Sequence, residues 1–170
     1  SLRLHVTHRA EPGDSVRDYL EMEVASGLAN IDYYRQFGQR AGVLRDELRA
    51  LLYDLKAKGR SIAAYGAAAK GATLLNFAGI DNTVIDFVVD RNIHKVGLFM
   101  PGVEIPIREP EALRAELPDH VLILTWNFAG EIVRQQEWYI RAGGKFVLPI
   151  PRPMVLDDVA EVQGADYAVA

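Results

Sequence analysis

Apolar residues between positions 31 and 58 recur at steps of mainly three and four. This spacing places them on one face of a long helix. Gly59 follows directly and predicts the end of the helix, because glycine adopts the left-handed cap conformation at little cost. The apolar stripe consists of Phe37, Ala41, Leu44, Leu48, Leu51, Leu52 and Leu55.

The first eight residues, "SLRLHVTH", alternate between apolar and polar side chains as a strand does. The strand has no neighbour close in sequence, so we interpret it as the tail of a preceding domain; the alternative is a strand of the chain's own sheet. The unpaired edge of this apolar strand can pair with the same strand of a second copy, so a homodimer is one expected assembly. A linker, "RAEPGDS", follows, and Ser15 is the expected cap of a first helix that runs to Gly27.

From residue 60 onward, strand patterns alternate with helix patterns. Because parallel strands need crossover helices, this order predicts an α/β fold: a Rossmann-like, mostly parallel sheet of about five strands with helices on both faces. We expect strands at 61–66, 84–90, 104–109, 120–126 and 145–150, and helices at 70–80, 110–117 and 128–144. The expected organisation is a remnant strand and linker at 1–14, a helical segment at 15–59, the Rossmann-like domain at 60–156 and a tail at 157–170.

Composition narrows the function classes. The 170 residues are 49% hydrophobic and carry a net charge of −4, so the chain can bury a core and is not expected to bind nucleic acid. It contains no cysteine, which excludes disulfides and cysteine-bound zinc within the chain. No apolar run reaches the roughly 18 residues of a membrane span. The four histidines lack a metal-binding spacing, and we expect no metal site in this chain and a cytoplasmic location.

The stretch "YGAAAKGAT" resembles a dinucleotide-binding turn in which one glycine is replaced. Gly66 and Gly71 stand where such a turn needs a tight bend and close helix–strand packing, but Ala68 occupies the position of closest approach to a pyrophosphate. The start of the following helix still offers free N–H groups, and Lys70 and Thr73 lie nearby as donors. Lys70 has an alternative role as an ordinary exposed residue.

Asp90 ends the second predicted strand, 19 residues after Gly71. An acidic residue near this spacing binds the ribose of NAD in redox enzymes, so an NAD(P)-dependent oxidoreductase is one hypothesis. The alternative is a turn residue, because aspartate often begins a β-turn. The basic residues Arg91, His94 and Lys95 that follow are interpreted as solvated loop charges.

Further candidates lie after the fourth and fifth strands. Trp126 is suited to stack on a base or sugar, and Asn127 either caps the next helix or binds a ligand. Arg152 follows the fifth strand in "LPIPRP", where it either reaches an anion or remains exposed beside stiffening prolines. No GxSxG or GxxxxGK[ST] motif is present, and we find no nucleophile with its base.

Four segments, "IAAYGAAAKGATLLNFAGI", "VVDRNIHKVGLFMPGVEIPI", "VLILTWNF" and "GGKFVLPIPRP", together resemble the C-terminal domain of SAM-dependent sugar C-methyltransferases. The resemblance covers about residues 15–156, and the opening "SLRLHV" is similar to the last strand of that family's methyltransferase domain. Several motifs in the same order are more specific than one glycine turn.

The resemblance implies a longer protein with an N-terminal zinc region, a central SAM-binding domain and this C-terminal domain. Its chemistry would remove a proton beside the keto group of a nucleotide-linked deoxysugar and methylate that carbon. This chain would be inactive alone and would form one wall of the nucleotide-sugar cleft, with the methyltransferase domain as its partner. An oxidoreductase domain and a structural or dimerisation module remain the alternatives. By motif position, the implied substrate-binding residues are Tyr65, Gly66, Lys70, Thr73, Trp126 and Asn127, followed by Asp90 and Arg152.

Overall fold

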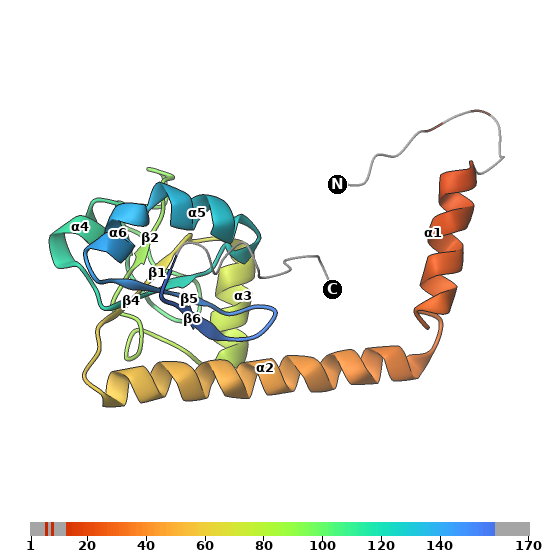
Figure 1. Cartoon of the computed structure of the whole chain (residues 1–170), viewed down its shortest axis with the longest axis horizontal. Coiled ribbons are helices and arrows are strands. Elements are labelled where there is room, and N and C mark those ends of the chain that lie inside the picture. Colours follow the sequence, from red (N-terminus) through yellow and green to blue (C-terminus); the bar gives the residue numbers. More distant parts are fainter. Residues whose placement is uncertain (1–5, 7, 9–12, 159–170) are drawn as a thin grey trace. The chain divides into compact units, whose positions relative to one another are not determined.

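The computed structural model describes Val6, His8 and residues 13–158 (Figure 1). The strand predicted at residues 1–8 and the tail predicted from residue 157 lie largely outside the described residues. The chain divides into two compact units, residues 1–41 and 42–170.

The first unit contains helix α1, Asp14–Ala25, and the start of helix α2, Ile31–Ala57. The prediction that Ser15 caps the first helix is wrong. Gly13 is the N-cap, in extended conformation, and Ser15 lies inside the helix. Asp14 at the first helical position places a negative charge where the helix dipole favours it, which accounts for the earlier start.

Helix α2 confirms the prediction of a long helix over residues 31–58. Its N-terminus is capped by Asn30, whose side-chain oxygen accepts the Asp32 N–H at 2.9 Å. It ends before Gly59, which has the positive φ of +74° that a left-handed cap needs. Three leucines of its second half are fully or nearly buried: Leu48, Leu52 and Leu55.

The second unit contains a six-stranded sheet with helices on both faces, which confirms the predicted α/β class. The order is β3-β2-β1-β4-β5-β6, and every neighbouring pair is parallel except the antiparallel β5–β6 pair. The strands are β1 Ile62–Tyr65, β2 Val88–Val89, β3 Ile107–Arg108, β4 His120–Ile123, β5 Lys145–Leu148 and β6 Met154–Leu156.

The observed strands are shorter than predicted, and two further details of the strand prediction are wrong. The sequence pattern missed β6, which has only three residues and follows a proline-rich turn that hides its alternation. The second strand was expected to begin at residue 84, but β2 begins at Val88. Asp81 explains the delay, because its carboxylate accepts the Thr83 N–H at 2.9 Å and its carbonyl accepts the Val84 N–H, so the chain is still turning there.

The remaining helices are α3 Ala69–Ala78, α4 Ala112–Glu116, the 3₁₀ turn η1 Trp126–Phe128, α5 Ala129–Gln135 and α6 Glu137–Arg141. One continuous helix was predicted over 128–144. The structure instead breaks it at Gln136, whose backbone leaves the helical region and whose side chain accepts the Trp138 indole N–H at 2.7 Å. Within the described residues, no helix is long and apolar enough to cross a membrane.

The sheet separates two apolar cores. Ala64 of β1 points into the core beneath α2 and α3, whereas Ala63 and Tyr65 point into the core beneath α4, α5 and α6 (Figure 1). This alternation is the period of a strand buried on both faces. A Cβ on Gly71 would lie 2.8 Å from Leu124 Cβ, so α3 packs against the end of β4 as closely as the glycine motif predicted.

Candidate functional site

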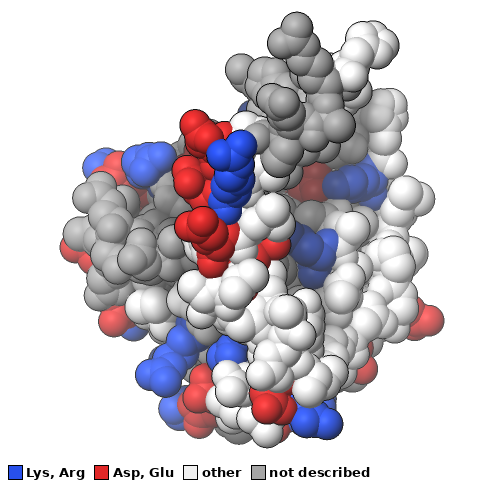
Figure 2. Space-filling model, turned by 90° about the vertical axis from the view of Figure 1, so that its right-hand side faces the viewer, with Lys and Arg blue, Asp and Glu red and all other residues white. Residues whose placement is uncertain are grey.

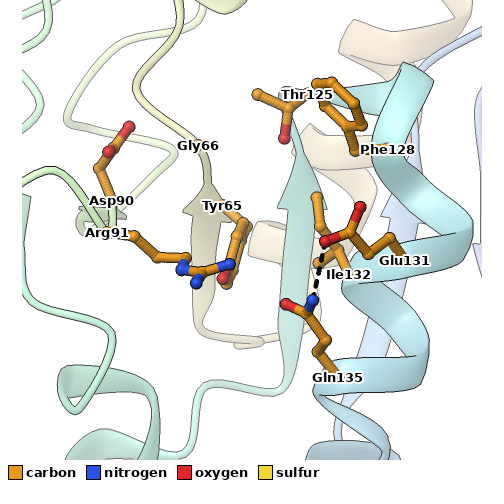
Figure 3. Close-up of a pocket in the computed structure, with 9 residues that line it drawn as sticks. All are labelled: Tyr65, Gly66, Asp90, Arg91, Thr125, Phe128, Glu131, Ile132 and Gln135. Atoms are coloured by element: carbon orange, nitrogen blue, oxygen red, sulfur yellow. Dashed lines mark hydrogen bonds between the residues drawn. The ribbon is translucent and has the colours of Figure 1, made fainter.

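The candidate site lies where strand order reverses, at the carboxyl ends of β1 and β4. The chain leaves β1 toward β2 and leaves β4 toward β5, in opposite directions across the sheet. In open α/β sheets, ligands bind in the crevice at such a point. A pocket of about 260 Å³ opens here (Figure 3), lined by Tyr65, Gly66, Asp90, Arg91, Thr125, Phe128, Glu131, Ile132 and Gln135.

Gly66 forms the turn between β1 and α3 at the pocket. Its φ is +93°, a conformation that side chains disfavour, and its N–H donates to the Val89 carbonyl at 2.8 Å. A Cβ at this position would lie 2.6 Å from Thr125 Cγ2. The loops after β1 and β4 therefore touch here, and only glycine permits that contact.

Asp90 lines the pocket and also holds the glycine turn. Its carboxylate accepts the Ala67 N–H at 2.7 Å and the Asn92 N–H at 2.8 Å. Lys95 supports the same turn, because its ammonium donates to the Ala67 carbonyl at 2.8 Å and to the Asp90 carboxylate at 3.2 Å. Asp90 thus acts as the turn residue that one interpretation expected, and most of its acceptor capacity is used within the protein.

Tyr65 and Arg91 form the β-strand side of the pocket. Tyr65 is 5% exposed, and burial raises the pKa of its hydroxyl while the nearby positive charge of Arg91 opposes the shift. The Arg91 guanidinium points toward Tyr65 in Figure 3. Arg91 is exposed, as the sequence interpretation of a solvated loop charge expected, but that interpretation did not place it at a pocket. The signal available was that Arg91 directly follows a strand that ends at the binding edge of the sheet.

Helix α5 supplies the opposite wall, which the sequence prediction missed altogether. Glu131, Ile132 and Gln135 line the pocket from this helix, and Phe128 lines it from the 3₁₀ turn before it. The Gln135 amide donates to the Glu131 carboxylate at 2.8 Å. The sequence did contain a signal for this wall. These residues follow the fourth strand at steps of three and four, which places their side chains on one face of a helix.

Lys70, Trp126 and Asn127 form a cluster at the same edge of the sheet. The Lys70 ammonium donates to the Asn127 side-chain oxygen and lies 4.4 Å from the centre of the Trp126 ring. Partial burial lowers the pKa of Lys70. Asn127 lies within η1 and does not cap α5, so the expectation that it caps the following helix is wrong. The three residues are brought together, although they do not line the pocket.

The other two candidates lie apart from the pocket lining. The Thr73 hydroxyl donates to the Ala69 carbonyl within α3 at 3.1 Å, and the residue is exposed. Arg152 is exposed in the turn between β5 and β6. Among the described residues, no group of three histidine, cysteine, aspartate or glutamate side chains is placed to hold a metal ion.

The charged surface shows no strong bias on the face seen in Figure 2. Acidic and basic side chains are interspersed there and separated by uncharged surface. The basic residues near the pocket, Arg91 and Lys95, are local features of the turn after β2.

Comparison with known proteins identifies the family. Residues 1–151 match the family described as "C-methyltransferase C-terminal domain". The chain is also similar to C-methyltransferase NovU of Streptomyces niveus, with 36% identity over 149 residues. That match covers 88% of this chain and 35% of the relative, so the chain spans about a third of the relative's length. The chain belongs to the C-methyltransferase C-terminal domain family.

Proposed function

We propose that this chain is the nucleotide-sugar-binding part of a SAM-dependent C-methyltransferase that acts on an NDP-linked deoxy-ketosugar. The observation that carries the proposal is the pocket at the ends of β1 and β4, with an arginine and a tyrosine on one side and a carboxylate and an amide on the other. Family membership supports C-methylation as the activity of the larger protein.

Two cations support the binding of a diphosphate near the Gly66 turn. Arg91 follows β2, and Lys70 lies in the first turn of α3, a ten-residue helix whose N–H groups and dipole favour negative charge. Lys70 uses one of its three donors on Asn127, which leaves donors for a ligand. In this proposal Lys70 and Arg91 bind phosphate oxygens, and Trp126 holds the Lys70 side chain in place.

The chemistry itself is assigned to parts of the protein outside this chain. The substrate would lose a proton from the carbon beside its keto group, and that carbon would then attack the methyl group of SAM. We place the SAM-binding loop, the acid and base residues and the zinc outside this chain, and we expect the chain alone to be inactive. The methyltransferase domain would close the pocket from its open side.

The oxidoreductase hypothesis receives less support from the geometry. In NAD enzymes the acidic residue after the second strand binds the ribose. Here the Asp90 side chain is 14% exposed and accepts hydrogen bonds from Ala67, Asn92 and Lys95. Ala68 also adds a methyl group beside the turn. We therefore favour a nucleotide sugar over NAD as the ligand.

Calorimetric titration with dTDP, UDP, NAD and SAM in parallel tests the proposal. We expect weak binding of dTDP or UDP, no binding of SAM, and loss of nucleotide binding in R91A. The matched control is R134A, which removes an exposed arginine of α5 that does not line the pocket and should leave binding unchanged. Selective binding of NAD, or equal losses in R91A and R134A, would overturn the proposal.

A further inference from the structure

The pair formed by Glu131 and Gln135 has hydrogen-bonding capacity left over. Their mutual bond uses one of the two amide N–H groups and one acceptor position of the carboxylate. A second amide donor therefore remains next to free carboxylate acceptors, and both side chains line the pocket (Figure 3). Both side chains are exposed, and the bond between them keeps this donor and acceptor next to each other.

We propose that this pair recognises the edge of a uracil or thymine ring. The ring N3–H would donate to the Glu131 carboxylate, and a neighbouring ring carbonyl would accept from the Gln135 amide. This inference rests on the proposed nucleotide-sugar function. It adds that the pocket binds the base of the nucleotide and that Glu131 and Gln135 distinguish one base from another.

The size and lining of the pocket suit one flat ring. Its volume of about 260 Å³ is below the roughly 300–1,000 Å³ of pockets that enclose a complete drug-sized ligand, so it holds one part of a nucleotide sugar. Phe128 and Ile132 supply apolar surface on the α5 side, and Tyr65 supplies an aromatic ring on the β1 side. A base is the flat and largely apolar part of a nucleotide.

The charges fix the direction of the ligand. A phosphate beside Glu131 would face a like charge, whereas a phosphate beside Arg91 would face an opposite charge. Arg91 and Glu131 come from different walls of the pocket, the loop after β2 and helix α5. The base therefore points toward α5, and the diphosphate points toward Arg91 and the Gly66 turn.

The pair favours an imide over cytosine. Uracil and thymine have a carbonyl on each side of N3–H, so they match a neighbouring carboxylate and amide in two ring orientations. Cytosine places its amine beside a single ring nitrogen and matches in one orientation only. Gln135 can donate to either carbonyl of an imide without moving away from Glu131. We therefore expect UDP and dTDP to bind more tightly than CDP.

Titration of the chain with dTDP and with N3-methyl-dTDP tests the assignment. Methylation removes the donated N–H, and because hydrogen bonds to charged groups are the stronger kind, we expect it to weaken binding at least about tenfold. In E131A, dTDP should bind about tenfold more weakly than in the wild type, and the effect of methylation should disappear. The control variant E111Q changes an exposed glutamate outside the pocket and should leave both affinities unchanged.

The outcomes separate this inference from the proposed function. If dTDP binds but methylation changes nothing, or if CDP binds as tightly as UDP, the base assignment is wrong and nucleotide binding stands. If E131A retains the penalty for methylation, the N3–H does not meet Glu131, and the assignment is again wrong. If the wild type binds none of the nucleotides in the millimolar range, both proposals fail.

Discussion

Gly66 and Thr125 approach each other so closely that a Cβ on Gly66 would lie 2.6 Å from Thr125 Cγ2 and 2.7 Å from its hydroxyl oxygen. The contact joins the loops after β1 and β4, the two strands between which the order of the sheet reverses. The position of the pocket therefore depends on the absence of one side chain.

Gly66→Ala should destabilise the second unit by about 3 kcal/mol, because it adds steric overlap to a strained φ. Gly97→Ala is the matched control: its φ is +83°, but nothing lies within 4 Å of the added Cβ, so it should cost only about 1 kcal/mol. Urea unfolding followed by fluorescence measures both, since Trp126 and Trp138 lie in this unit. Equal costs would show that the Thr125 contact is absent. In the G66A background, Thr125→Ala should recover part of the loss.

Asp90→Ala should cost about 2 kcal/mol, because it leaves the buried Ala67 N–H without its acceptor. Asp90→Asn keeps one acceptor oxygen and should cost less. Thermal unfolding of the two variants measures the difference. A variant that keeps full stability and loses only nucleotide binding would show that Asp90 is a ligand residue and not a support for the turn.

His120 should make stability depend on pH. It is 6% exposed, its Nδ1 has no hydrogen-bond partner among the described residues, and burial lowers its pKa from the ordinary 6.5. Asp119 and Asp157 oppose this shift, and Lys145 and Arg60 add to it. Below pH 6.5 the unfolded chain takes up the proton first, so stability is complete above that pH and falls as the pH decreases toward the lowered pKa.

The measurement is the free energy of unfolding of wild type and His120→Gln between pH 7.5 and about 5. The variant should lose the part of the pH dependence that His120 causes, whatever its absolute stability. His94→Gln, at an exposed histidine, is the control and should keep the wild-type slope. An unchanged slope in His120→Gln would contradict the assignment.

Arg49 of α2 caps the far end of α3. Its guanidinium donates to the Ala78 carbonyl and, at 3.1 Å, to the Gly79 carbonyl. Arg49→Met should lower stability by about 1–2 kcal/mol, since both carbonyls lose a charged donor. Arg45→Met, which removes an exposed pair with Asp46 on the same helix, should cost less than Arg49→Met. Similar losses in the two variants would show that Arg49 does not act as a cap.

The fold was predictable because its signals are local. The apolar stripe of α2 ends at Gly59, and Gly66 and Gly71 mark a tight turn and a close helix–strand contact. The alternation of strand and helix from residue 60 then leaves few arrangements other than a parallel sheet. The short strand β6 escaped prediction because three residues after a proline-rich turn are too few to show an alternating pattern. The break at Gln136 escaped prediction because a single non-helical residue scarcely changes the periodicity of a helix.

The site was predictable on one side only. Tyr65, Gly66 and Asp90 could be placed from the glycine motif and its spacing. Glu131 and Gln135 could not, because an acidic and an amide residue one turn apart look like any exposed helix surface until the sheet brings β1 and β2 beside α5. Arg91 could not be assigned to the pocket for the same reason, because an arginine in a loop looks like any exposed charge until the residues across the pocket are known.

Amide chemical shifts recorded while the chain is titrated with dTDP test the central claim most directly. Binding in the pocket should shift the amides of Gly66, Arg91, Thr125, Glu131 and Gln135 together, with little change along α1 and the first half of α2. Shifts confined to other parts of the chain, or no shifts at millimolar dTDP, would contradict a nucleotide site at the ends of β1 and β4.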